Sequence, residues 1–373
     1  MMRPLRNDRG IALFLVLWIL MLLSVIVGEF CYAMRTEVNI ARNFKEEAQS
    51  YYIAKAGVTI GINELLRHLA QPAVVVSVAG PGEAPPEDRW RINRAMPDFS
   101  YGGGFFRIRL EDEGGKVNIN RAGPGLLRAM LTGFDLSDAE KDIIVDSIQD
   151  WRDGDDFHRM NGAEEAYYQA LTEPYHAKNG DFSSPEELMR VRGVTAQIFH
   201  GGLREMITVH PGSPRMPIGG TSRAPAPFNY NQINVNAAPA VLLESLPGMT
   251  RELADAVIAG RETTPLRSYG DLISVLGPDA YGAASPYLAV QDSPVYAVTA
   301  VGYPSAEGEL PGGGLHRGVR AIIEITSGPG RKYRILQWVD NLGVFQGGPR
   351  AAQHRAIHER PEGTPQAGLR RRN

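Results

Sequence analysis

The most pronounced pattern along the chain is an uncharged apolar run over residues 11–28 (IALFLVLWILMLLSVIVG). As a helix, a run of this length spans about 27 Å, close to the hydrocarbon thickness of a bilayer. Arg3, Arg6 and Arg9 precede the run, and only Asp8 opposes them. The pattern therefore predicts a membrane-spanning helix over 11–28, with its N-terminus in the cytoplasm and the rest of the chain across the membrane.

The apolar pattern continues past this run with helical spacing. Apolar side chains recur every three or four residues on one face, and the opposite face is polar. The apolar face consists of Ile40, Phe44, Ala48, Tyr51, Ala54, Val58, Ile62, Leu65 and Leu69. We expect a single helix over 11–69, with its first half in lipid and its second half against a soluble domain. Two helices with a break near Gly28 are the alternative.

Strand-like patterns occur at two places that are far apart in the sequence. They have period-two alternation or are rich in β-branched residues, and they are residues 105–110, 296–301, 319–325 and 333–339. Three glycines at 312–314 predict a hairpin loop between two of them. We expect residues 70–110 and 294–345 to form one α/β domain, an antiparallel sheet packed on the long helix.

The residues between these strands have helical patterns and contain a diverged repeat. The string at 117–122 (VNINRA) returns at 233–238 (INVNAA), and each string is followed by a proline and a short helix pattern. We interpret the Asn-x-Asn strings as turn and N-cap chemistry for the following helix. The repeat predicts two successive regions of short helices, over 111–212 and over 230–293.

Each repeat also contains a string that resembles a helix-hairpin-helix, around Gly193 and around Gly248. The DNA-binding form needs a second glycine, so that backbone N–H groups approach a phosphate, but Thr195 and Thr250 stand there. Residues 111–205 carry 19 acidic and 10 basic side chains. Phosphate binding needs the opposite charge. We therefore interpret the hairpins as packing units and expect no nucleic-acid partner.

Length, charge and cysteine content exclude several classes of protein. A length of 373 residues suggests two or three domains, and a net charge of -3 argues against a protein that coats nucleic acid along its whole length. The near-neutral total is a cancellation, because a basic leader and a basic tail offset the acidic helical regions. We expect the tail over 346–373 to be disordered. The single cysteine, Cys31, excludes an intramolecular disulfide framework and a Cys-rich zinc site.

The most chemically suggestive segment is an acidic loop with the sequence DWRDGDD at 150–156, followed by NGAEE at 161–165. Four carboxylates in seven residues repel one another unless a positive charge lies among them. Oxygen ligands with a glycine for the turn are what Ca²⁺ selects, but the EF-hand spacing is absent. A solvated acidic loop and a metal site both fit this composition. We find none of the common catalytic motifs, so we expect no enzyme.

The N-terminus offers a second specific motif. Arg9-Gly10 immediately before the apolar run resembles the class III leader of type IV pilin-like proteins, which a prepilin peptidase cleaves after the glycine. Ile11 would then become the first residue and the apolar helix would be retained. A plain membrane anchor is the alternative. Such leaders usually have Glu at the fifth mature position, where a glutamate is thought to neutralise a neighbouring subunit's amine. Here that position is Leu15.

Together these features resemble the K-type minor pseudopilins of type II secretion. The resemblance runs in order through the leader with Leu15, the 117–122 string, the acidic loop and the 233–238 string. It implies a long N-terminal transmembrane helix packed on a pilin-like antiparallel sheet. An all-α domain of helix-hairpin-helix or SAM-like type is inserted in that sheet, together with a small second α/β region, so the fold class is α+β.

The resemblance also implies a calcium site, which we assign to seven side chains of the acidic region. These are Asp150, Asp153, Asp155, Asp156 and Glu164, with Glu165 and Asn179 less firmly. The implied partners are the I- and J-type minor pseudopilins, a prepilin peptidase, the inner-membrane secretion platform and membrane lipid. The implied function is to form the pseudopilus tip, from a single-pass position in a Gram-negative inner membrane with the bulk of the chain periplasmic. The alternative is a membrane-anchored DNA receptor that uses the hairpin repeats.

Overall fold

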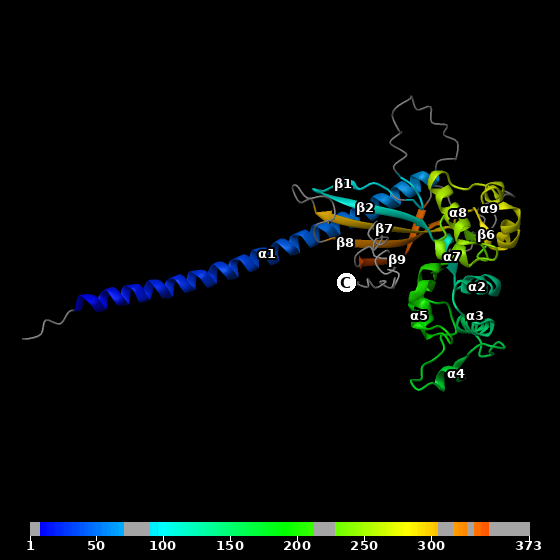
Figure 1. Cartoon of the computed structure of the whole chain (residues 1–373), viewed down its shortest axis with the longest axis horizontal. Helices are drawn as coiled ribbons and strands as arrows, with labels where there is room; N and C mark the ends of the chain where they lie inside the picture. The colour runs from blue at the N-terminus through cyan, green and yellow to red at the C-terminus, as the bar shows by residue number, and fades with distance from the viewer. Residues whose placement is uncertain are drawn as a thin grey trace, which may run out of the picture.

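A single helix, α1 (Asp8–Ala70), dominates the N-terminal part of the computed structural model. The structure describes residues 8–70, 90–94, 96–211, 228–304, 316–326 and 332–342. The helix has 63 residues and runs unbroken through Gly28, so the alternative of two helices is wrong. Its first half projects alone and its side chains are exposed from Leu13 to Phe44 (Figure 1). Within the described residues, α1 is the one helix long and apolar enough to cross a membrane.

The second half of α1 packs on one face of a five-stranded sheet (Figure 1). The strands are β1 (Phe99–Tyr101), β2 (Gly104–Asp112), β7 (Val295–Pro304), β8 (Arg317–Thr326) and β9 (Lys332–Leu342). Their order is β1-β2-β7-β8-β9, and every pairing is antiparallel. The expected antiparallel sheet on the long helix is therefore confirmed. The short strand β1 was not predicted, because three residues are too few to show an alternating pattern.

The interface between α1 and the sheet is apolar and close-packed. Ala54, Val58 and Leu65 of α1 are fully buried against the sheet residues that alternate inward, such as Ile108 and Val298. The closest approach is at Gly302 of β7, where a methyl group would overlap the backbone of α1. Glycine is therefore needed at this position for the helix to lie directly on the strand.

All elements between β2 and β7 belong to the inserted region, which forms two lobes beyond one end of the sheet (Figure 1). The first lobe contains β3 (Val117–Asn118), α2 (Pro124–Met130), α3 (Asp138–Arg152), α4 (Glu165–Gln169), α5 (Ala196–Ile198), α6 (Arg204–Met206) and β4 (Ile207–Thr208). The second contains β5 (Ile233–Asn234), α7 (Ala240–Ser245), α8 (Arg251–Thr263), α9 (Tyr269–Ala284) and β6 (Leu288–Ala289). Four short 3₁₀ helices are η2 (Glu113–Gly115), η3 (Leu131–Gly133), η4 (Pro185–Arg190) and η6 (Ser285–Tyr287), and η5 (Phe199–Leu203) is π-helical.

The sequence repeat corresponds to a structural repeat. Each lobe begins and ends on a two-residue parallel pair, β3 with β4 and β5 with β6. Arg152 donates to the carbonyl oxygens of Ile119 and Ala122, and Arg261 donates in the same way to those of Val235 and Ala238. One arginine therefore fixes the equivalent turn in each lobe.

The Asn-x-Asn strings act as turns, which confirms half of their interpretation. The side-chain oxygens of Asn118 and Asn234 accept hydrogen bonds from the backbone two residues on, each over 3.0 Å. The N-cap half is wrong, because Gly123 and Pro239 occupy the caps of α2 and α7 and neither has a side-chain acceptor.

The hairpin-like strings have the local geometry that their glycines suggest. Gly193 and Gly248 adopt positive φ angles of 87° and 77°. The threonines in place of a second glycine, Thr195 and Thr250, cap the next helix through their side-chain oxygens. The predicted 312–314 loop and the 346–373 tail lie outside the described residues.

Candidate metal centre

The acidic loop begins at the C-terminal end of α3 and leads into α4. A capping box at Ser137 and Glu140 starts α3, and its apolar face places Trp151 in the core against the rings of Tyr168 and Phe182. The chain leaves the helix at Asp153. Trp151 therefore anchors the point from which the carboxylates of the loop extend.

Three of the predicted ligands meet at one point. Oxygen atoms of Asp153, Asp155 and Glu164 all lie within 4.8 Å of one another. Glu164 is only 4% exposed, and neither of its carboxylate oxygens has a hydrogen-bond partner among the described residues. In the same part of the structure, Asp153 Oδ1 and Asn179 Oδ1 are also buried and accept no hydrogen bond from any residue that the structure describes. Buried acceptors without donors are costly, so this group of oxygens fits a cation.

Asp150 lies beside this group but has a different partner. Its side chain is fully buried. It accepts hydrogen bonds from the backbone N of Arg159 over 3.1 Å and from the guanidinium Nη1 over 2.6 Å. Burial raises the pKa of the Asp150 carboxyl, and the hydrogen bonds from Arg159 oppose that rise. The carboxylate is therefore held by a protein cation.

The other three predicted ligands, Asp156, Glu165 and Asn179, differ in how they lie relative to this group. Asn179 has a positive φ of 45°, and its Nδ2 donates to Asp156 Oδ1 over 2.9 Å and to the carbonyl of Asp155. Glu165 is directed elsewhere, because its oxygens accept from the backbone N of Ala177 and contact the ring of His176. The structure thus separates Glu165 from the point where Asp153, Asp155 and Glu164 meet.

The electrostatics of the group are those of a site short of positive charge. Burial raises the pKa of the Glu164 carboxyl to about 7, and the carboxylates of Asp150, Asp153, Asp156 and Asp155 add to the rise. A divalent cation among these oxygens would stabilise the ionised form of Glu164 and so offset both causes. All of the available atoms are hard oxygens, including a carboxylate with both oxygens free, which is the ligand chemistry that suits Ca²⁺.

The leader residues lie at the free end of α1. Gly10 and Ile11 fall within its first turns, and the side chains there are outside the described residues. Leu15 is 54% exposed. The position of the cleavage site therefore stays a prediction.

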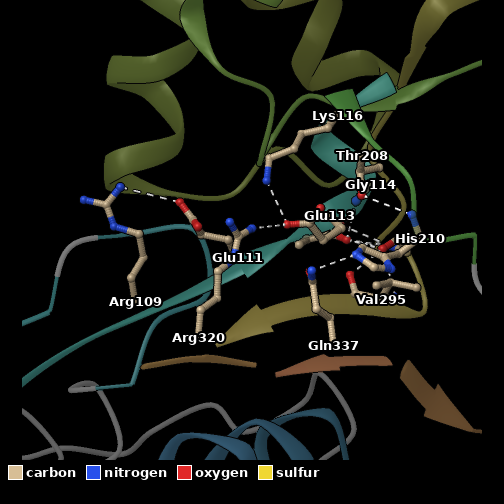
Figure 2. A network of polar contacts seen from close by, with 12 residues as sticks. Arg109, Glu111, Glu113, Gly114, Lys116, Thr208, His210, Val295, Arg320 and Gln337 are labelled. Carbon is tan, nitrogen blue, oxygen red and sulfur yellow. Dashed lines mark hydrogen bonds and ion pairs between the residues drawn. The ribbon is translucent and has the colours of Figure 1, made fainter. Parts of the chain in front are cut away.

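A second polar cluster, which the sequence did not indicate, joins the inserted region to the sheet (Figure 2). Glu113 is 3% exposed and accepts from Lys116 Nζ over 2.8 Å and from Arg320 of β8 over 2.9 Å. Burial would raise the pKa of Glu113, but the two cations outweigh it and hold the pKa at about 2. Arg320 is 207 residues away in the chain, so no local pattern could reveal this pair.

The same junction contains a polar cavity and a second buried acid. The cavity has a volume of about 770 Å³, and its walls include Arg109 and Arg320 of the sheet and His210 of the first lobe. His210 contacts Gln337 of β9 across it (Figure 2). Asp112, the last residue of β2, accepts from the backbone N of Gly114 and Ser293. Burial and the nearby Asp292 carboxylate raise its pKa to about 6.

Comparisons with known proteins agree on one family. A family model described as "Type II secretion system (T2SS), protein K" matches residues 109–212, and a second model with the same description matches residues 233–291. The type II secretion system protein K of Aeromonas hydrophila is 26% identical over 213 residues, which are 52% of this chain and 61% of that protein. The corresponding protein of Pectobacterium carotovorum is 24% identical over 307 residues, which are 76% and 85% of the two chains.

Among solved structures, this chain resembles one in the crystal structure of the GspK-GspI-GspJ complex from enterotoxigenic Escherichia coli. The TM-score is 0.53 at 16% identity, and the match covers 81% of this chain and 99% of that one. At this identity the likeness shows the fold. The alignment with the Aeromonas relative spans about three-fifths of that relative's length.

Proposed function

The chain belongs to the type II secretion system protein K family, and on that premise we propose that it is a minor pseudopilin at the tip of the secretion pseudopilus. There it would initiate or cap assembly for the export of folded periplasmic proteins. Its role is structural rather than catalytic. The observation that carries the proposal is a pilin-like helix and sheet that is interrupted by the two segments the family models match.

The shape of the molecule supports a position at the tip. The inserted lobes lie beyond the end of the sheet that faces away from the free half of α1 (Figure 1). A subunit stacked above this chain would have to occupy the space of those lobes. The related structure was solved as a complex with GspI and GspJ, which supports I- and J-type minor pseudopilins as partners of this chain.

Co-purification and secretion together test this function. The full-length chain, extracted in detergent from cells that also express the I- and J-type subunits, should co-purify with both. Deleting its gene should abolish export of the secreted proteins, and a wild-type copy of the gene should restore export. Normal export in the deletion strain, or purification free of both subunits, would contradict the proposal.

Leu15 provides a finer test in the same strain. We propose that a tip subunit does not need the glutamate that neutralises an amine of the subunit above it. The Leu15→Glu variant should therefore appear along the filament as well as at its tip, as seen by labelling the chain on isolated pseudopili. An unchanged tip position would count against this role of Leu15.

The leader makes a separate prediction, for processing by a prepilin peptidase. N-terminal sequencing of the mature membrane protein should begin at Ile11, because Arg9-Gly10 precedes the apolar run. A Gly10→Val variant should retain the residues before Ile11 and stay longer by that segment. Recovery of Met1 from the wild-type chain would show a plain anchor instead.

The same helix defines the proposed location. Its apolar, exposed first half indicates membrane anchoring. We propose a single pass through the inner membrane, in contact with lipid and with the secretion platform, with the N-terminus cytoplasmic and the sheet and lobes periplasmic. The alternative of a DNA receptor gains no support from the matched proteins.

We also propose that the acidic loop holds Ca²⁺. The observation behind this proposal is the set of buried, unpartnered oxygens on Asp153, Glu164 and Asn179, with Asp155 adjacent. The ion would supply the missing positive charge and cross-link the loop between α3 and α4. By binding the same ion, these four side chains would fix the conformation of the loop.

The pH dependence of calcium affinity follows from Glu164. Without the ion its carboxyl has a pKa of about 7, so below that pH binding must displace a proton. The affinity should fall by up to about tenfold per pH unit as the pH drops below 7, measured by calorimetry. A flat profile between pH 5.5 and 7 would contradict the assignment.

The stability of the calcium-free chain should change in the opposite sense. The folded-state pKa of Glu164 lies above its ordinary value of 4.5, so the stabilisation is complete below pH 4.5 and is lost as the pH rises through 7. Asp112 acts in the same direction, with a pKa of about 6. Measuring how the stability of the calcium-free chain depends on pH therefore requires a Glu164→Gln control, which isolates the contribution of Glu164.

A further inference from the structure

Arg159 lies among the acidic side chains of the loop that it belongs to. Its Nη1 is 2.6 Å from Asp150 Oδ1 and 2.6 Å from Asp153 Oδ2, so a single nitrogen bridges the two carboxylates. Its backbone N also donates to Asp150. The guanidinium therefore ties the middle of the loop back to the last turn of α3.

Asp150 and Asp153 differ in how many of their carboxylate oxygens accept a hydrogen bond from Arg159. Both oxygens of Asp150 accept from Arg159, and Gly162 packs against this side chain so closely that a Cβ there would overlap it. Asp153 gives only Oδ2 to Arg159, and its Oδ1 stays buried and unpartnered. The oxygens of Asp153 thus divide between a protein cation and the site.

We propose that Arg159 is the positioning residue of the calcium site: it holds Asp150 out of the ligand set and turns Asp153 Oδ1 toward Glu164. The inference rests on the calcium site proposed above. The ligands are then Asp153 through one oxygen, Asp155, Asn179 through Oδ1 and Glu164 through both oxygens. Glu164, 4% exposed with both oxygens unpartnered, is the observation that requires a ligand here.

A cation beside a metal site can act in two opposing ways. If Arg159 acted only through its charge, it would repel Ca²⁺, and removing it would tighten binding. If it acts by positioning, removal frees Asp153 to turn away and leaves Asp150 buried with a single backbone donor, so binding weakens. Groups that orient metal ligands typically contribute about 10- to 100-fold in affinity. The two roles therefore differ in the sign of the effect.

The test is a calcium titration of the full-length chain in detergent, by calorimetry, on the wild type and on Arg159→Met and Arg159→Lys. We expect Arg159→Met to bind Ca²⁺ at least about tenfold more weakly, and Arg159→Lys, which keeps a donor in place, to recover most of the loss. Thermal melting in excess chelator supplies the folding control. Loss of binding with a calcium-free melting temperature far below that of the wild type would mean a structural role and overturn the proposal.

Asp153→Asn tests the ligand side of the same arrangement. Because Asp153 gives its second oxygen to the ion, this variant should lose at least about tenfold in affinity. Tighter binding by Arg159→Met would overturn the positioning role and leave the calcium site standing. A wild-type chain that binds no Ca²⁺ would overturn both.

Discussion

We expect the Glu164→Gln variant to bind Ca²⁺ about a hundredfold more weakly than the wild-type chain, a loss of about 2.7 kcal/mol. Glu164 offers the site two free oxygens and a full negative charge, and both are buried where water cannot replace them. Glutamine keeps the shape but supplies one neutral oxygen. Calorimetric titration with CaCl₂ measures the difference directly.

The same variant should behave in the opposite way without the ion. Because burial and four neighbouring carboxylates oppose the ionised form of Glu164, a neutral glutamine relieves the calcium-free protein of an unfavourable charge. In chelator, Glu164→Gln should melt at or above the wild-type temperature. With CaCl₂ the order should reverse, because only the wild type gains stability from the bound ion.

Glu165→Gln is the matched control for this experiment. Glu165 is the next residue in the chain and carries the same charge, but its oxygens serve Ala177 and His176. The calcium affinity of this variant should stay within about threefold of wild type, because the Glu165 oxygens are not among those that meet at Glu164. Equal losses in the two variants would mean that total charge, and not the geometry around Glu164, determines binding.

The second large effect is expected at Gly302, where alanine should destabilise the fold by about 3 kcal/mol. A methyl group there would lie 2.7 Å from the backbone N of Ala54 and closer still to the carbonyl oxygen of Ser50. Both obstacles are backbone atoms of a rigid helix, so no side-chain rotation relieves the overlap. Thermal unfolding of the detergent-solubilised chain should show a melting temperature lower by several degrees.

Gly260→Ala is the control for Gly302→Ala. Gly260 lies inside α8, and a methyl group there meets no atom within 4 Å among the described residues. Alanine favours a helix over glycine by about 0.5 to 1 kcal/mol, so this variant should be neutral or slightly more stable. If Gly302→Ala were as stable as Gly260→Ala, α1 would not lie as close to β7 as the structure shows.

The long helix and the main strands could be predicted because their signals are local and periodic. The stripe ending at Leu69 extends over many turns, and the alternation of 105–110 leaves one face clearly apolar. The pairing of β2 with β7 is different in kind. It joins Arg107 to Val301 across the whole inserted region, and period-two patterns do not say which strand neighbours which.

The acidic loop shows where local reasoning stops. Composition alone required a positive charge among the carboxylates, and the structure supplies one in Arg159 while leaving the oxygens around Glu164 unpartnered. Which carboxylate pairs with the arginine depends on how the loop folds back on α3. The interpretation of the Asn-x-Asn strings was half correct. The turns are local and were predicted, but the helices that follow have Gly123 and Pro239 at their N-caps and not an asparagine.

The position of the inserted region between β2 and β7 has a consequence for how the protein folds. The pairing of β2 with β7 cannot be completed until the chain has been made as far as Pro304, because β7 ends there. Until then the apolar face of α1 that covers the sheet, including Val58 and Leu65, has β2 beside it but lacks its contacts with β7 and β8. Pairing strands so far apart in sequence is slow. The newly made chain therefore passes through a stage in which the long helix exposes part of its core face, which a chaperone or a neighbouring pilin-like helix could shield.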